Sequence, residues 1–189
     1  MPINVNDKAI DFEVFDFNGK KQQLLGHGHP VLLSFFRHAG CPMCNLRTRE
    51  LILAHDKMQQ YGLKVMAVFE SPAKSIKRDV GRQNPPFPLI PDPQRLLYKL
   101  YGVTISWLGF VKIFAVRPKH VYQAIFKNSF IPKFAEATPM MPADFLIDPN
   151  GTVRIAYYGT DIGDHLPLDD LYTALDNIKT SVDIKPEVV

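Results

Sequence analysis

The chain has 189 residues and a formal net charge of +3 at pH 7, with 46% hydrophobic and 22% charged residues. These values are typical of one globular domain and exclude a disordered or fibrous chain, and so mild a charge gives no reason to expect a nucleic-acid partner. No apolar run approaches the roughly 18–20 residues of a membrane-spanning helix, and the N-terminus lacks a secretory signal pattern. We therefore expect a single cytoplasmic domain over residues 1–189, without a transmembrane segment.

The first half of the chain alternates predicted strands and helices. Residues 12–24 alternate apolar and polar side chains around an Asn-Gly pair, which predicts a β-hairpin. Residues 30–37 form a continuous apolar run, typical of a central strand covered on both faces. A helix is predicted from Pro42 to Tyr61, because proline suits the first helical position and apolar residues follow at three- and four-residue steps.

The second half continues the alternation and ends in a hairpin and a helix. The predicted elements are a strand at 63–70, a helix over 71–83 capped by Ser71, a strand at 87–90, a helix over 92–103, a hairpin over 143–159 that turns at Asn150-Gly151, and a closing helix from about Pro167. Strands that alternate with helices, followed by antiparallel strands, predict an α/β fold with a mixed central sheet flanked by helices.

One segment, residues 106–139, interrupts the alternation before the last hairpin. It is apolar and aromatic, and it carries five lysines and arginines against a single glutamate. We expect a helical insertion in which Pro118 separates two short helices, packed on the sheet or at a dimer contact. A substrate lid or a membrane-surface patch are the alternatives, because basic residues beside aromatic ones also suit a lipid surface.

Both cysteines of the chain, Cys41 and Cys44, lie where the predicted central strand gives way to a helix. Unpaired N–H groups and the helix dipole favour an anion there, so the pKa of Cys41 should fall and its thiolate should become reactive. Arg37 and His38 can add positive charge. Cys44 lies one helical turn further on, where it can attack a sulfenic acid or a mixed disulfide on Cys41. We expect Cys41 to attack and Cys44 to resolve.

Three other roles for the cysteine pair stay open. A structural disulfide would suit neither a reducing compartment nor so short a loop, which stabilises little. A zinc or copper site would need two further ligands, for which His27, His29 and His38 are candidates. The third alternative is a pair of buried, inert thiols.

Three stretches of the sequence share a family likeness. The stretch PPFPLIPDPQRLLYKLYGV resembles a peroxiredoxin segment in which a Phe-Pro-Leu strand leads to Asp-Pro and a helix ending in Tyr-Gly-Val. The stretch ADFLIDPNGTVR resembles the penultimate hairpin of that family, and FRHAGCPMC is similar to the Arg-x-x-Gly-Cys-x-x-Cys of peroxiredoxin-like proteins related to selenoprotein U. From about Lys8 to Asn177, apart from the insertion, the chain thus resembles the peroxiredoxin-like (AhpC/TSA) branch of the thioredoxin superfamily.

The resemblance implies a thioredoxin-like fold and one further site residue. Pro142 matches the cis-proline that faces the active cysteine in thioredoxin-fold proteins, where it would turn the Met141 backbone toward Cys41; an ordinary trans proline is the alternative. The sequence also departs from the family. His38 stands where typical peroxiredoxins have Thr or Ser, and Ser34 stands where they have Pro.

Nearby polar residues can replace the missing hydroxyl. His38 could bond the peroxide or the thiolate, and Arg37 could stabilise the negative charge that builds on the leaving oxygen, although a regularly alternating strand would point one of the two away. Arg47 is predicted to be a surface salt-bridge partner, and Glu70 a proton relay or a helix-entry carboxylate. The segment 161–167 is predicted to be a capping loop, with a metal-binding or site-facing role as the alternative.

The cysteine pair and the resemblance together predict a thiol-dependent oxidoreductase. It would reduce hydroperoxides through Cys41, with Cys44 as the resolving thiol and Arg37, His38 and Pro142 at the site. One alternative is a thiol–disulfide oxidoreductase that acts on protein disulfides with little peroxidase activity, and another is a metal-binding or scaffold protein. We expect no organic cofactor or metal, a thiol reductant such as thioredoxin or glutathione, and a homodimer as one possible assembly.

Overall fold

The central strand β3 (Val31–Phe36) is buried along its whole length and forms the middle of the main sheet. Five strands are hydrogen-bonded in the order β5-β4-β3-β6-β7. β3 runs parallel to β4 (Lys64–Phe69) and antiparallel to β6 (Ala143–Ile147). At the edges, β5 (Leu89–Pro91) is parallel to β4 and β7 (Val153–Tyr158) is antiparallel to β6. The predicted mixed sheet is therefore confirmed.

The computed structural model describes residues 1–116, 118–122 and 138–183. A separate two-stranded sheet near the N-terminus pairs β1 (Glu13–Phe15) antiparallel with β2 (Lys21–Gln23). This is the hairpin that the Asn-Gly pair predicts. The second predicted hairpin, between β6 and β7, is confirmed as well.

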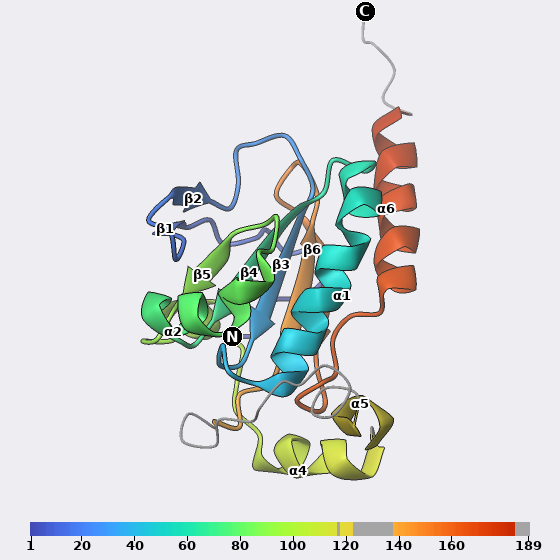
Figure 1. The fold of residues 1–189 in the computed structure, drawn as a ribbon. Helices are drawn as coiled ribbons and strands as arrows, with labels where there is room; N and C mark the ends of the chain where they lie inside the picture. Colours follow the sequence, from blue (N-terminus) through green and yellow to red (C-terminus); the bar gives the residue numbers. More distant parts are fainter. Residues whose placement is uncertain (117, 123–137, 184–189) are drawn as a thin grey trace, which may run out of the picture.

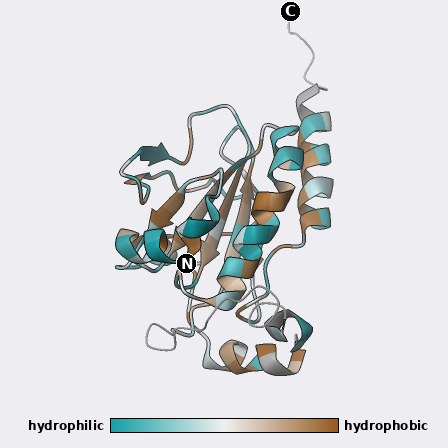
Figure 2. Ribbon diagram, viewed as in Figure 1, coloured by the Kyte–Doolittle hydropathy of each residue, from teal (hydrophilic) through white to brown (hydrophobic). Residues whose placement is uncertain are grey.

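Helices cover both faces of the main sheet (Figure 1). Leu32 and Phe36 of β3 belong to the core under α1 and α6, whereas Phe35 packs against Tyr98 on the opposite face. Because β3 is covered on both sides, all its positions are buried, and the strands of the main sheet carry mostly hydrophobic colours in Figure 2. The helices are α1 (Pro42–Gln59), α2 (Ala73–Arg78), the 3-10 helix η1 (Val80–Gln83), α3 (Leu96–Leu100), α4 (Trp107–Val116), α5 (Pro118–Tyr122) and α6 (Leu168–Asp183).

Two of these helices begin differently from the prediction. Ser71 does not cap α2; its Oγ instead accepts a hydrogen bond from the N–H of Ala39 at 2.9 Å. α3 begins only at Leu96, because Arg95 before it has a left-handed backbone (φ 57°). The carboxylate of Asp92 accepts the N–H groups of Leu96 and Leu97 at 2.9 and 2.7 Å. The Ser71 hydroxyl thus bonds to a distant loop, whereas Asp92 accepts the first N–H groups of α3 from outside the helix.

The segment before β6 contains the two predicted short helices. α4 ends at Val116 and α5 begins at Pro118, as the proline predicts. α4 lies at the end of the molecule where α1 begins (Figure 1). Residues 123–137 lie outside the described residues, so the full extent of the insertion, 106–139, and the single-domain organisation over 1–189 stay predictions.

Candidate active site

Cys41 lies between the end of β3 and the first turn of α1, as the sequence predicts. It is the N-cap residue of α1, with an extended backbone (φ −74°, ψ 125°), and Pro42 follows as the first helical residue. Cys41 and Cys44 are both free thiols, and each is 1% exposed. The Cys41 side chain makes no capping hydrogen bond to the helix. The Cys44 thiol and the charges of Arg37 and His38 lower the pKa of Cys41 most, and the backbone of Cys44, in the first turn of α1, lowers it further through a hydrogen bond. The expectation that the first amides of α1 favour the thiolate is therefore supported, but as a smaller effect than expected.

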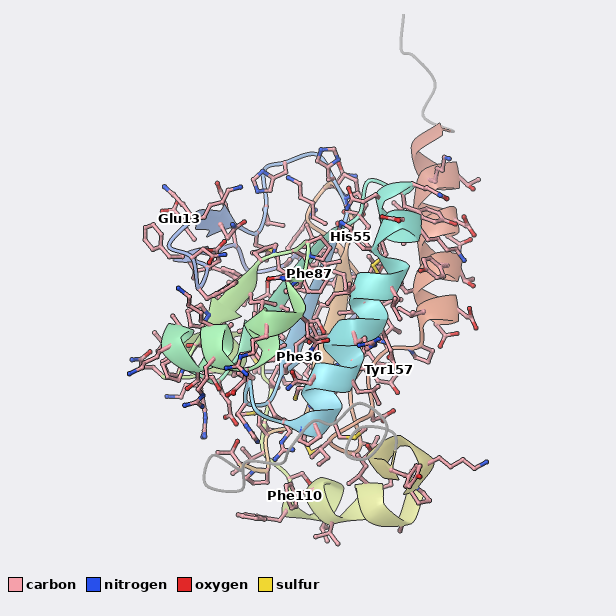
Figure 3. The ribbon with its side chains drawn as sticks, viewed as in Figure 1. Glu13, Phe36, His55, Phe87, Phe110 and Tyr157 are labelled. Carbon is pink, nitrogen blue, oxygen red and sulfur yellow. The ribbon has the colours of Figure 1, made fainter. Side chains whose placement is uncertain are left out.

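A buried arginine also contacts the Cys41 sulfur. Arg37, directly after β3, is 3% exposed, and its Nη1 donates to Cys41 Sγ at 3.3 Å. Its Nε and Nη2 donate to the carbonyl oxygen of Thr138 at 2.9 and 2.6 Å. The ring of Phe110, labelled in Figure 3, lies 5.0 Å from the guanidinium carbon. Although Cys41 lies within the apolar core, its sulfur thus faces a fixed positive charge.

The two thiols have opposite pKa shifts. The hydrogen bond with the Cys44 thiol does most to hold the pKa of Cys41 well below its usual value; the charges of Arg37 and His38 add to this, and burial opposes it. Burial, and then the interaction with Cys41, raises the pKa of Cys44 well above its usual value. These opposite shifts favour a thiolate on Cys41 beside a protonated thiol on Cys44, which suits a nucleophile and its resolving partner.

The loop before Cys41 is held by a side chain that the sequence analysis missed. Asn45 Nδ2 donates to the carbonyl oxygens of Ala39 and Cys41 at 2.7 and 2.9 Å, and Asn45 Oδ1 accepts from Gln83 Nε2 at 3.1 Å. Asn45 is buried. A polar amide in the first turn of a helix, one turn after the nucleophile, is the signal that could have indicated this role.

A polar cavity of about 330 Å³ opens beside the cysteine loop, lined by His38, Glu70, Arg95 and Thr138 among others. Glu70 Oε2 lies 2.9 Å from Arg95 Nε, and the Thr138 hydroxyl donates to the other carboxylate oxygen. Burial raises the pKa of Glu70, against the lowering effect of Arg95 and Arg37. Glu70 is therefore held in an ion pair next to the site, and a proton-relay role for it stays a prediction.

A buried charged cluster, also missed by the sequence analysis, lies behind the cysteine helix. Asp144 of β6 is fully buried opposite Ser34 of β3, whose hydroxyl donates to it. His165 Nδ1 lies 3.0 Å from Asp144 Oδ2, and the N–H of Leu166 donates to the same oxygen at 2.8 Å. The segment 161–167, expected to be a capping loop, thus turns His165 inward onto the sheet.

The surroundings of Asp144 determine its ionisation. Burial would raise its pKa, but the charge of and hydrogen bond with His165, the charge of Arg47 and the Ser34 hydroxyl outweigh burial and lower it to about 2. A carboxyl whose pKa is lower in the folded state stabilises the fold above its unfolded pKa. From an unfolded pKa near 3.9, the contribution is about 2–3 kcal/mol, and it is lost as the pH falls from about 4 to 2.

Arg47 is not the surface residue that the sequence predicts. It does pair with Glu50 at 3.3 Å, but its side chain is only 8% exposed. Its Nη2 donates to the carbonyl oxygen of Leu166 at 2.7 Å, which ties α1 to the loop before α6. Arg47 is buried because it packs against this loop. The local sequence of α1 does not reveal where the loop lies.

Pro142 lacks the cis bond that the resemblance predicts, since no cis peptide bond occurs in the described ranges. The segment pairs with its neighbours as an extension of β6: the N–H of Met141 donates to Thr104 O at 3.0 Å, and Pro142 O accepts from the N–H of Gly159 at 2.9 Å. These bonds hold the chain extended in the trans form. The cis-proline expectation is therefore wrong, and a role for Pro142 in the site stays a prediction.

Residues 5–156 match the family described as AhpC/TSA, which is most of the chain. The chain belongs to the AhpC/TSA family. This membership confirms the resemblance drawn from the sequence, and it supports a thiol-dependent oxidoreductase of the peroxiredoxin-like, hydroperoxide-reducing kind. A comparison with curated proteins gave no match.

Solved structures of peroxiredoxins have the same fold as this AhpC/TSA protein. Peroxidoxin BcpB from Mycobacterium tuberculosis has a TM-score of 0.65 and 17% identity, covering 93% of this chain and 96% of that one. A mutant of peroxiredoxin 6 of Arenicola marina has a TM-score of 0.69 and 14% identity, covering 99% and 80%. The bacterioferritin comigratory protein of Xanthomonas campestris, studied for its alkyl peroxide reduction activity, has a TM-score of 0.61 and 16% identity, covering 90% and 91%. These likenesses confirm the predicted thioredoxin-like fold.

The described ranges were compared with the requirements of a membrane span and of a metal site. No helix within these ranges combines the length and apolar character needed to cross a bilayer. Nor do three or more histidine, cysteine or acidic side chains gather there as ligands around a metal ion would. Of the candidate zinc ligands, His27 contacts the carbonyl oxygen of Gln23 and His38 lies beside the cysteine loop.

Proposed function

We propose that Cys41 is the residue of this AhpC/TSA protein that attacks hydroperoxides. Its thiolate attacks the terminal oxygen of the hydroperoxide; the S–O bond forms, the O–O bond breaks, and the released alkoxide or hydroxide takes up a proton. Cys41 is thereby oxidised to a sulfenic acid. The observation that carries the proposal is the 3.3 Å contact between Arg37 Nη1 and Cys41 Sγ, because this charge stabilises both the thiolate and the negative charge developing on the leaving oxygen.

Cys44 is assigned the resolving step. Its raised pKa keeps it protonated while Cys41 is a thiolate, so it does not compete for the peroxide. Its sulfur then displaces the hydroxyl of the Cys41 sulfenic acid, water leaves, and a Cys41–Cys44 disulfide forms. An external thiol, of the thioredoxin or glutathione kind, restores both thiols and is itself oxidised. These thiols must stay reduced between turnovers, which supports the cytoplasm as the place of action.

The polar cavity is assigned as the route to the buried sulfur. Cys41 is 1% exposed, and the cavity wall includes His38 and Thr138, the second of which holds Arg37 through its carbonyl oxygen. A hydroperoxide that enters here meets the imidazole of His38 in place of the hydroxyl that typical peroxiredoxins supply. A homodimer stays a prediction.

Initial rates with three oxidants test the proposal. Hydrogen peroxide, an organic hydroperoxide and a protein disulfide are compared in the parent protein and in the Cys41→Ser and Cys44→Ser variants, with excess thiol. We expect hydroperoxide consumption that Cys41→Ser abolishes and that Cys44→Ser retains for the first turnover. A Cys41→Ser protein that consumed hydroperoxide as fast as the parent would refute the proposal. A parent that reduced only the protein disulfide would instead favour the thiol–disulfide oxidoreductase, which the missing hydroxyl at position 38 also favours.

A further inference from the structure

The helix α4 has two faces of different character, and its inner face is anchored at the active site. Phe110 packs over the guanidinium of Arg37, and Ile113 is 1% exposed. Gly109 allows the close approach of this helix: a Cβ there would lie 2.7 Å from Met141 Sδ and 3.0 Å from the carbonyl oxygen of Thr160. These three residues share one side of the helix, since they lie one, three and four positions apart.

The outer face of α4 is apolar and open to solvent. Trp107 is 66% exposed, Leu108 86% and Val111 63%, and Ala115 is also exposed. Successive residues of a helix are turned by about 100°, so these four side chains share one stripe opposite the anchored face. Figure 2 shows α4 largely in hydrophobic colours at the end of the molecule. Nothing in the described part of the chain covers this stripe.

The charge around the stripe indicates what covers it. The sequence from 105 to 122 contains Lys112, Arg117 and Lys119 and no aspartate or glutamate. Lys112 and Lys119 are exposed, as is the aromatic ring of Tyr122. Two copies of the chain that met through this stripe would bring like charges together. An anionic surface complements it, and an apolar stripe with tryptophan, tyrosine and flanking lysines is the pattern of a helix that lies in the interface of a lipid bilayer.

We propose that the outer face of α4, formed by Trp107, Leu108, Val111 and Ala115, docks on an anionic phospholipid bilayer. α4 would lie along the surface, with its apolar side chains among the lipid headgroups and acyl chains and its lysines at the phosphates. Because the opposite face of the same helix packs on Arg37, docking places the Cys41 site beside the bilayer. The substrates of the docked protein are then lipid hydroperoxides, an assignment that rests on the proposed function.

Vesicle binding tests the docking directly, because Trp107 is the only tryptophan of the chain. Its fluorescence is followed as vesicles of phosphatidylcholine alone, or of phosphatidylcholine with phosphatidylglycerol, are added. We expect a blue shift and cosedimentation with the anionic vesicles, with binding on the order of 100-fold stronger than to the neutral ones, since each cation near an anionic surface contributes several-fold. High salt should weaken this binding.

Two variants locate the binding surface. Leu108→Asp with Val111→Asp, both on the stripe, should weaken binding to anionic vesicles at least about tenfold. Leu53→Asp is the matched control, because Leu53 is 76% exposed on α1 and not on the stripe. The proposal would be overturned by unchanged binding of the double variant or by equal binding of the parent to neutral and anionic vesicles. It would also be overturned if the parent and Leu53→Asp were dimers in solution and the double variant were a monomer.

The docking and the proposed function can fail separately. The Cys41→Ser variant should bind anionic vesicles as the parent does, because docking needs no thiol. The double stripe variant should consume hydrogen peroxide in buffer at the parent rate but lose at least about tenfold in rate on vesicle-borne lipid hydroperoxide, in proportion to its lost binding. Equal rates on vesicle-borne hydroperoxide for the double variant and the parent would contradict the assignment of lipid hydroperoxides.

Discussion

Replacing Arg37 with methionine should lower the reactivity of Cys41, because the variant keeps the length of the side chain and removes its charge. The lost contact is the 3.3 Å hydrogen bond to Cys41 Sγ. A hydrogen bond to a charged group contributes about 1.5–3 kcal/mol, so well below the pKa of Cys41 the thiolate population should fall about 10- to 150-fold. A more basic thiolate is a better nucleophile, with a Brønsted coefficient of about 0.4–0.5, which leaves a net loss of roughly 3- to 20-fold in rate.

The assay for this variant is the rate of thiol alkylation between acid and neutral pH, in the Cys44→Ser background so that only Cys41 reacts. Arg49→Met is the control, because Arg49 lies on α1 with its side chain exposed to solvent. Circular dichroism should show that both variants fold. The reasoning is refuted if the pH profile of the Arg37→Met protein superimposes on that of its parent, since the guanidinium would then contribute nothing to the thiolate.

Four further substitutions test the structure around the site. Asp144→Asn removes the buried carboxylate beside Arg47 and His165 and should destabilise the fold by about 3–5 kcal/mol. We expect the parent's melting temperature to fall with pH between about 4 and 2 and this variant's to fall less, and an equal pH dependence in both would contradict the low pKa. Gly159→Ala places a Cβ 2.3 Å from the carbonyl oxygen of Asp164 and should destabilise by about 1–3 kcal/mol. Gly163→Ala, whose Cβ meets only the movable ends of two side chains within 3 Å, should melt close to the parent, and equal losses in both would contradict this account. Asn45→Ala removes the two hydrogen bonds that Asn45 Nδ2 donates to the cysteine loop and should lower stability by about 1–3 kcal/mol. It should also slow Cys41 alkylation at neutral pH, whereas a rate equal to the parent's would show that the loop keeps its conformation without Asn45.

The elements that could be predicted from the sequence are those with a strong local pattern. The apolar run of β3 and the Asn-Gly pairs of the two hairpins determine their structure within a few residues, so these predictions were confirmed. The place of Cys41 before α1 followed from Pro42 and the end of the run. Helix starts were less certain, because the hydroxyl of Ser71 bonds to a loop 32 residues away.

The parts of the site that could not be predicted depend on register and on distant segments. Ser34 and Asp144 are single polar residues within apolar strands, and only the pairing of β3 with β6 brings them together. Arg37 reaches Cys41 because Thr138, far along the chain, accepts its other two donors. β3 ends at Phe36, so the strand alternation that would point one of Arg37 and His38 away does not extend to them. Both residues are buried, and the charge of each lowers the pKa of Cys41.

The central claim is that a peroxide oxidises Cys41 and that Cys44 then resolves it. The most direct measurement is the intact mass of the reduced protein after one equivalent of an organic hydroperoxide. The parent should lose two hydrogen atoms as the disulfide forms, the Cys44→Ser variant should gain one oxygen atom on Cys41, and the Cys41→Ser variant should keep its mass. An oxygen atom gained by Cys41→Ser as quickly as by Cys44→Ser, or an unchanged mass of the parent, would contradict the account.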